Sequence, residues 1–338
     1  MGLNSILKTL FLSFGIVFLL FFGGCSTKRV FEPKKVQEDW QCYGSSNESI
    51  VDISSDIALL EDSKVLTKDG ILDLNIDKSY RLVGKSDGWV ISTSIDGNVT
   101  LQSIKESSLV EKFNLKKTVA AASAKGDILA VLFADNEMAL YRISTKEPLL
   151  KEQGSAPIAV DSRIVNPYFM NDLVLFLTLD GRVVIVNSAL KKKLRSIIVS
   201  SADDFNNIIY FNVIDSRLIA ATSSKILSFG NKETRVKYEI RNVAYDGKDI
   251  FITTKQGEIV SLTPALQVNA KVKFPFAHFL GLIVYGDKVY ALETEGYMIE
   301  LSKDLLKYSI HEVDIEDGYV FVGRKKFFVD DEYICVVK

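Results

Sequence analysis

Cysteine, histidine and tryptophan are scarce in this chain of 338 residues, which has three Cys, two His and two Trp. So few ligands exclude zinc fingers, iron–sulfur clusters and thioredoxin-type Cys-x-x-Cys sites, all of which need several of these residues at close spacing. Proline is also rare, with six residues, and no long polar tract occurs, which excludes a largely disordered or collagen-like chain. We therefore expect no bound metal and no cofactor.

An excess of positive charge is also absent, since 41 Lys and Arg residues face 43 Asp and Glu residues, for a formal net charge of −2. A general nucleic-acid binder needs surplus cations to displace counterions from phosphates, so we expect no nucleic-acid partner. The composition is otherwise that of a globular protein, with 47% hydrophobic and 25% charged residues. Twenty Phe and thirteen Tyr residues favour β-structure.

One apolar stretch stands near the N-terminus, over residues 9–22. At about 14 residues it is short for a helix that spans a bilayer core of about 30 Å. It ends in Phe22-Gly23-Gly24-Cys25, with small residues directly before a cysteine and polar residues after it. This pattern resembles the lipobox of bacterial lipoproteins, with Phe22 in place of the usual leucine. The resemblance implies cleavage after residue 24 and acylation of Cys25, against the alternative of an uncleaved membrane helix.

The domain organisation expected from this pattern has three parts. Residues 1–24 form a lipoprotein signal peptide, residues 25–48 a lipidated tether that lacks hydrophobic periodicity, and residues 49–338 a folded domain. Two or three acyl chains, at about 0.8 kcal/mol per buried CH₂, are enough to hold a protein on a membrane. Because Ser26 rather than Asp follows the cysteine, the enterobacterial sorting rule implies an outer-membrane lipoprotein that faces the periplasm.

Beyond residue 50, short apolar or alternating runs are separated by tight turns, the pattern of strands and hairpins. Turns of the Asp-Gly, Asp-Asn, Gln-Gly or Glu-Gly kind, with one less regular copy, fall near residues 97, 136, 181, 223, 257 and 296. Their spacings of 39, 45, 42, 34 and 39 residues are typical of a β-propeller with four strands per blade. With one earlier and one last unit, the sequence predicts an all-β propeller of eight blades, or seven if the end units merge; a pair of β-sandwiches or an irregular barrel is the alternative.

Two cysteines lie near the two ends of the predicted ring. Cys42 precedes the first blade, and Cys335 lies in the last strand of the chain. These ends are neighbours in a closed propeller, and the periplasm is oxidising. We therefore predict a Cys42–Cys335 disulfide, which would restrict the unfolded chain by about 5 kcal/mol in the loop-entropy model. The alternative is two separate thiols.

Two segments match catalytic motifs on paper. Residues 84–88 fit G-x-S-x-G, but they continue into a predicted strand instead of a helix, and the chain offers few histidines as a base. Ser79 stands where a phosphate-binding loop would need its first glycine. We therefore assign no catalytic residue and no small-molecule substrate.

Asn98, in an Asn-x-Thr pattern after Asp96, is a candidate site of bacterial N-glycosylation or simply part of a turn.

Charged clusters occur at predicted turns. The basic runs 191–195 and 324–326 are interpreted as solvated loops, or as contacts with an acidic partner or phospholipid headgroups. The acidic runs 203–204 and 330–332 are interpreted as solvated turns, because no D-x-D-x-D-G loop with a distal Glu appears.

The units at 171–194 and 286–308 resemble the repeats of quinoprotein-like propellers, each with a strand, an acidic-Gly turn and a further strand. The usual blade-closing T-G-x-x-x-W is missing, since Trp40 and Trp89 stand elsewhere. A lipid-anchored propeller of this repeat type resembles the accessory lipoproteins of the outer-membrane β-barrel assembly machine. The resemblance implies a non-enzymatic scaffold that binds other assembly proteins. The alternatives are a surface or periplasmic binding module for carbohydrate, peptidoglycan or a host protein, and a quinone-cofactor dehydrogenase.

Overall fold

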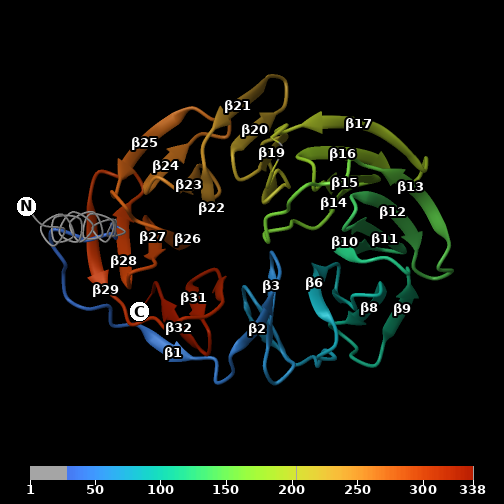
Figure 1. The fold of residues 1–338 in the computed structure, drawn as a ribbon, viewed down its shortest axis with the longest axis horizontal. Helices are drawn as coiled ribbons and strands as arrows, with labels where there is room; N and C mark the ends of the chain where they lie inside the picture. The colour runs from blue at the N-terminus through green and yellow to red at the C-terminus, as the bar shows by residue number, and fades with distance from the viewer. Residues whose placement is uncertain (1–28, 203, 338) are drawn as a thin grey trace, which may run out of the picture.

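Thirty-two strands and no helix form the part of the chain described by the computed structural model, residues 29–202 and 204–337. They make eight sheets of four antiparallel strands, arranged around a ring (Figure 1). The predicted eight-bladed β-propeller is therefore confirmed. The expected signal peptide and Cys25 lie outside the described residues. Within those residues, no helix is long and apolar enough to cross a membrane.

Each of the first seven blades is continuous in sequence, and its first strand lies nearest the axis of the ring (Figure 1). Blade 1 consists of β2 (Ile50–Ile53), β3 (Ile57–Leu60), β4 (Val65–Thr67) and β5 (Gly70–Leu72). Blade 2 consists of β6 (Arg81–Ser86), β7 (Trp89–Thr93), β8 (Asn98–Ser103) and β9 (Val110–Asn114). Blade 3 consists of β10 (Val119–Lys125), β11 (Ile128–Phe133), β12 (Glu137–Arg142) and β13 (Pro148–Gln153). Blade 4 consists of β14 (Tyr168–Met170), β15 (Leu173–Leu177), β16 (Arg182–Asn187) and β17 (Lys192–Ile198).

The second half of the ring repeats this arrangement. Blade 5 consists of β18 (Tyr210–Ile214), β19 (Arg217–Ala221), β20 (Lys225–Phe229) and β21 (Glu233–Lys237). Blade 6 consists of β22 (Ile240–Tyr245), β23 (Ile250–Thr254), β24 (Glu258–Leu262) and β25 (Val268–Lys273). Blade 7 is β26 (Phe279–Tyr285), β27 (Lys288–Glu293), β28 (Tyr297–Ser302), β29 (Tyr308–Glu312), and blade 8 is β30 (Val320–Val322), β31 (Lys326–Val329), β32 (Glu332–Cys335) and β1 (Tyr43–Ser45).

The core consists of apolar layers between neighbouring blades. Middle strands such as β11 and β23 are buried along almost their whole length. A strand buried on both faces reads as a continuous apolar run, because each face packs against a different blade. Eight clusters of buried side chains result, one at each contact between consecutive blades, and the one formed by Ile50, Leu60, Phe321 and Phe328 joins blade 8 to blade 1.

One hydrogen bond recurs in every blade. In seven blades the residue that follows the outermost strand donates its backbone N–H to a carbonyl in the turn between the second and third strands, as Leu115 does to Gly97 and Phe274 to Gly257. In blade 1 the donor is Ile76, four residues after the end of β5. The carbonyl is on a residue with positive φ in six blades, namely Ser63, Gly97, Asn136, Gly181, Gly257 and Gly296. Glycine and asparagine adopt this conformation at little cost, which explains the turn residues that produced the repeat in the sequence.

The N-terminal segment closes the ring. β1 pairs with β32 as the outermost strand of blade 8, with Tyr43 opposite Ile334. Upstream, the N–H groups of Gln37 and Trp40 donate to the carbonyls of Ile310 and Glu312 on blade 7. Phe31 is buried, only 5% exposed. The expected tether over 25–48 is therefore corrected: from residue 29 on it lies against the propeller, and the first blade strand begins at Tyr43 instead of residue 49. The sequence does not predict these contacts, because single buried residues and a strand of three residues are too short to produce a hydrophobic periodicity.

Candidate binding faces

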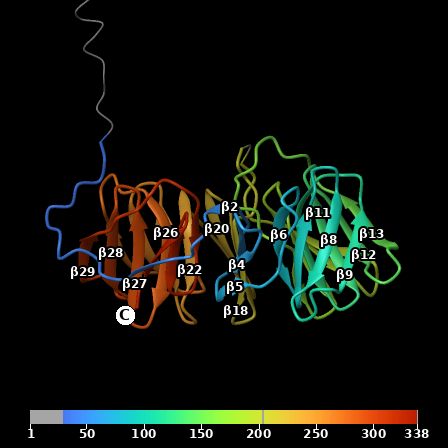
Figure 2. The same ribbon diagram turned by 90° about the horizontal axis from the view of Figure 1, so that it is seen from below.

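The ring has two loop-bearing faces. We call the crossover face the one that carries the connections from one blade to the next, such as 115–118 and 274–278, together with the turns to which they hydrogen-bond, such as 94–97 and 255–257. The opposite hairpin face carries the remaining turns within blades, such as 87–88 and 303–307. Figure 2 shows the described chain starting at the upper side of the ring, which is the crossover face.

A 14-residue connection on the crossover face, residues 154–167 between β13 and β14, reaches toward the centre of the ring (Figure 1). Asn166 holds its end against two inner strands: its Nδ2 donates to the carbonyl of Val83 on β6 at 3.1 Å, and its Oδ1 accepts the N–H of Ala122 on β10 at 3.2 Å. Both groups belong to strands that line the axis, so this connection, the axial segment, occupies part of the channel.

The axial segment is also held on the other side of the ring. Arg163 donates to the carbonyl of Arg241 on β22 and, through Nε, to the Asp161 carboxylate at 2.8 Å. The Asp161 N–H in turn donates to Asn207 Oδ1 at 2.7 Å. Burial opposes ionisation of the Asp161 carboxyl, but the Arg163 hydrogen bonds outweigh it and lower its pKa. The segment therefore links blades 2 and 3 with blades 5 and 6 through polar contacts.

A cavity of about 230 Å³ remains beside the axial segment. Its lining is mostly apolar or hydroxyl-bearing and includes Val160 and Ile164 from the segment, with Arg81 as its only charged residue. On the hairpin side of the channel, Asp56 accepts the Lys85 N–H at 3.1 Å. Burial raises the pKa of the Asp56 carboxyl, against the lowering effect of that hydrogen bond. The Asp56 carboxylate joins the turn between β2 and β3 to β6, and the Asp161 carboxylate bonds Arg163 within the axial segment.

We expect Asn166→Ala to lower the free energy of unfolding by about 1 to 3 kcal/mol, because the Val83 carbonyl and the Ala122 N–H lose their partner within the ring. The axial segment should also become more sensitive to limited proteolysis. Urea unfolding and the rate of cleavage within 154–167 measure both effects. Asn269→Ala, which changes an exposed asparagine of outer strand β25, is the control; an equal loss of stability in both variants would contradict the role of Asn166.

The sequence-predicted site residues are dispersed over the ring. Cys42 and Cys335 are joined in a disulfide with Cα atoms 5.2 Å apart, next to the pairing of β1 with β32. Asn98 begins β8 half-buried, and its Nδ2 donates to Ser94 Oγ at 3.2 Å, so the nitrogen that would carry a glycan is engaged within the turn. Modification of Asn98 stays a prediction, as does acylation of Cys25.

The G-x-S-x-G match lies at a hairpin turn. Asp87 and Gly88 connect β6 to β7 with φ values of 45° and 81°. The Ser86 hydroxyl donates to the carbonyl of Ala124 at 2.6 Å. His278 and His311 are placed at blade 7, five blades further along the chain. This geometry brings no base to Ser86.

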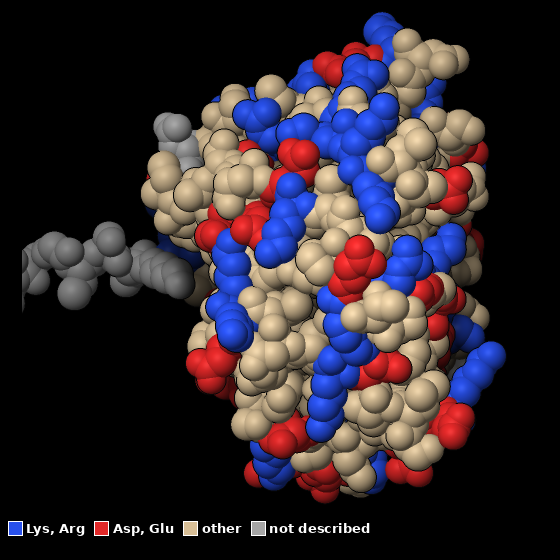
Figure 3. Space-filling model, turned by 90° about the vertical axis from the view of Figure 1, so that its right-hand side faces the viewer, with Lys and Arg blue, Asp and Glu red and all other residues tan. Residues whose placement is uncertain are grey.

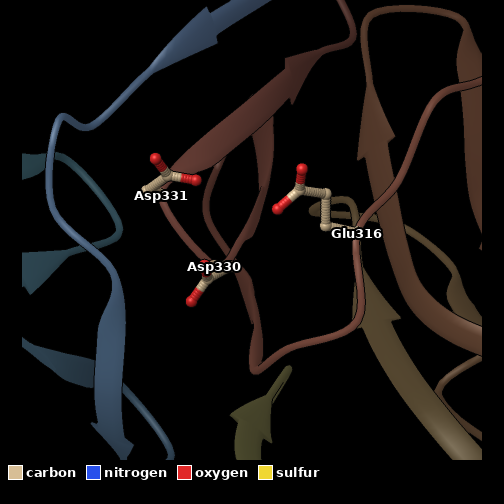
Figure 4. A group of neighbouring side chains, drawn as sticks. All are labelled: Glu316, Asp330 and Asp331. Carbon is tan, nitrogen blue, oxygen red and sulfur yellow. The ribbon is translucent and has the colours of Figure 1, made fainter.

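The acidic residues Glu316, Asp330 and Asp331 meet on the crossover face of blade 8, with carboxylate oxygens within 4.8 Å of one another (Figure 4). Asp330 accepts a hydrogen bond from Ser49 Oγ at 3.1 Å, which ties it to the start of blade 1. Neighbouring acids at turns are common without a cation, and we assign no metal site to them.

The basic run 191–195 forms an exposed outer strand instead of a loop. Lys191 is in the turn with positive φ, and Lys192 to Arg195 begin β17 on the rim of blade 4. No Asp or Glu occurs from residue 181 to 202, while Leu190, Leu194 and Ile198 are 62%, 47% and 43% exposed. Figure 3, which faces the rim on this side of the ring, shows Lys and Arg gathered toward its upper part. We call residues 190–198 the basic rim.

The second basic run is engaged locally. Arg324 pairs with Asp69 at 2.5 Å, and Lys326 Nζ lies 3.5 Å from the centre of the Tyr333 ring. Lys325 Nζ lies 4.6 Å from the centre of the Tyr285 ring. Cation–π contacts of this kind hold the turn against blades 7 and 8, so this run does not form a separate basic patch.

Comparison with known proteins gives relatives in sequence and in fold. No family model matches the chain. It is 28% identical over 360 aligned positions to the plasminogen-binding protein PgbB of Helicobacter pylori strain J99, and 27% identical to PgbB of strain 26695. Each alignment covers 93% of this chain and 65% of the relative, so the chain spans about two thirds of the length of these proteins.

Solved structures share the fold at low sequence identity. BamB from Moraxella catarrhalis superposes with a TM-score of 0.67 at 12% identity, covering 87% of this chain and 98% of that one. The C-terminal WD40 domain of Sif2 gives a TM-score of 0.65 at 9% identity, covering 90% and 100%. The chain is thus an eight-bladed β-propeller with a BamB-like fold and a sequence similar to that of PgbB.

Proposed function

We propose that this chain is a lipid-anchored propeller of the bacterial envelope that binds a protein partner and catalyses no reaction. The observation that carries the proposal is the basic rim, where Lys192, Lys193 and Arg195 lie on an outer strand beside exposed leucine and isoleucine side chains. Lys193 pairs with Glu152 at 2.9 Å, and Arg195 lies over the Phe229 ring at 4.7 Å. Charge of one sign steers an oppositely charged partner, and exposed apolar side chains supply area that a partner can bury. An acidic partner with an apolar surface fits this chemistry.

The axial segment supports the non-enzymatic part of the proposal. It fills channel space at the axis, where propeller enzymes of the quinoprotein kind hold their cofactor, and the cavity beside it carries one charged residue. Absorbance of the purified protein is the direct check: a bound quinone would overturn this part of the proposal.

For the identity of the partner, we propose the proteins that assemble outer-membrane β-barrels, with the propeller facing the periplasm. The BamB-like fold supports this role, although a fold shared at 12% identity is compatible with many functions. Affinity purification from cross-linked envelopes should recover the barrel-inserting protein with the wild-type chain. Its consistent absence would remove this role.

The double variant Lys192→Glu/Arg195→Glu should reduce that recovery about tenfold or more, since it reverses two charges at the centre of the basic rim. Lys273→Glu, on the outer strand of blade 6, is the matched control and should leave recovery unchanged. Equal recovery by all three proteins would place the binding surface elsewhere on the ring.

A second candidate is favoured by the sequence relatives. Similarity to PgbB over 93% of the chain supports a surface-exposed module that binds a host protein such as plasminogen. Protease treatment of intact cells separates the two roles, because a periplasmic protein survives and a surface protein is cleaved. Plasminogen binding by the purified chain then tests the second role, and the chain alone is the correct probe because the relatives contain further sequence.

A further inference from the structure

The described chain begins at a fixed point on the crossover face. Phe31 is 5% exposed and packs edge-on against Phe274 and Tyr297, with ring centres 6.1 and 5.6 Å apart. Arg29, two residues earlier, lies over the ring of Phe276 at 5.6 Å. Phe274 and Phe276 belong to the connection between blades 6 and 7, so the N-terminal chain is attached to the propeller at this connection.

The distance from this point to the proposed lipid is short. Arg29 is four residue steps from Cys25, and a fully extended chain covers at most about 3.5 Å per step, or about 14 Å. The strands of blade 7 have five to seven residues, so a six-residue strand extends about 20 Å from one face to the other. An acyl chain on Cys25 therefore reaches a bilayer placed at the crossover face but not one placed at the hairpin face.

The crossover face also carries exposed apolar side chains at its loop tips. Ile158, Phe205 and Phe276 are 76%, 53% and 47% exposed. They lie in three different connections between blades, namely those from blade 3 to 4, from blade 4 to 5 and from blade 6 to 7. Phe205 and Phe276 have φ values of 50° and 68°. Bulky residues are rare in this region of φ, and such outliers point to a functional constraint on the position. A bilayer interface is a medium in which exposed phenylalanine and isoleucine are favourable.

We infer that the crossover face lies against the bilayer that holds the lipid, with Phe276 beside the anchor and Ile158 and Phe205 as further contacts. This inference rests on the lipid anchoring in the proposed function. Glu316, Asp330 and Asp331 on the same face offer no attraction to anionic headgroups. We therefore assign the contact to the exposed apolar side chains, and it should persist at high salt. The basic rim and the hairpin face then remain available to protein partners.

The test uses the full lipidated chain and single thiols. Because Cys42 and Cys335 are bonded and Cys25 carries lipid, a cysteine introduced at one position is the free thiol that a fluorophore labels. Phe276→Cys is compared with Leu306→Cys, which is on the hairpin face of the same blade, and Phe205→Cys with Leu190→Cys, similarly placed on blade 4. Vesicles of phosphatidylethanolamine and phosphatidylglycerol containing brominated lipid act as the quencher.

We expect labels at 276 and 205 to be quenched at least twofold more strongly than labels at 306 and 190, at low and high salt. Quenching at 276 alone would leave the lipid as the sole contact and overturn the docking of the face. Equal quenching at all four positions would also overturn it. Flotation separates these results from failure of the anchor: if the wild-type chain floats with vesicles no better than Cys25→Ser, then the anchor and the docking fail together.

Discussion

Replacement of Cys335 by serine is expected to lower the free energy of unfolding by about 3 to 5 kcal/mol. The bond it removes closes a loop with a sequence separation of 293 residues, and its loss restores to the unfolded chain the conformational entropy that this loop closure had removed. It also fastens a strand of three residues, β1, to the edge of blade 8. Urea unfolding of the oxidised wild type and the variant measures the difference.

Two controls test whether the disulfide itself is the cause. Cys42→Ser should lower the free energy of unfolding by the same amount as Cys335→Ser. The double variant should be no less stable than either single variant, because both substitutions remove the same bond. Reductant should bring the wild type to the stability of the variants. A loss below about 1 kcal/mol would mean that the packing of blade 8 against blade 1 closes the ring without the bond.

Gly257→Ala should lower the free energy of unfolding by about 3 kcal/mol, combining left-handed strain with overpacking. Gly257 has a φ of 75°, and a methyl group on it would lie 2.1 Å from the carbonyl oxygen of Phe274. Because that carbonyl belongs to the backbone of the connection between blades 6 and 7, the clash cannot be relieved by rotating a side chain. Thermal or urea unfolding of the variant gives the value.

The matched control is Gly126→Ala, at a turn on the hairpin face. Gly126 also has a positive φ, of 55°, but a methyl group there would have no neighbour within 4 Å. Its expected loss is about 1 kcal/mol, the strain of the left-handed conformation alone. Equal losses of stability in the two variants would contradict the inference that the close approach of the Phe274 carbonyl to Gly257 adds to the strain.

The fold was predictable from sequence because its information is local. Each blade contributes turns such as Asp180-Gly181 and a buried second strand such as β15, and these repeat about every 40 residues. Blade 1 was less distinct because Ser63 occupies the position that glycine or asparagine holds in blades 2, 3, 4, 6 and 7. The prediction of eight blades thus followed from periodic signals, each readable within a few residues.

The binding faces were less predictable because their contacts are long-range and occur once. Arg163 reaches the carbonyl of Arg241, 78 residues away, and Phe31 packs beside Phe274. No repeat or spacing marks these residues, and the axial segment reads in sequence as an ordinary loop. The basic run at 191–195 was visible, but its position on an outer strand depended on the register of β16 and β17.

Blade 8 imposes an order on biogenesis. Its outer strand, β1, is synthesised before any other strand of the ring, whereas the three strands it completes are synthesised last. During synthesis, Tyr43–Ser45 therefore has no partner strand in blade 8 until residues up to Cys335 have been made. A chain truncated before β32 would keep seven complete blades and still lack closure, and its unpaired N-terminal strand and free Cys42 thiol would distinguish it from the complete ring.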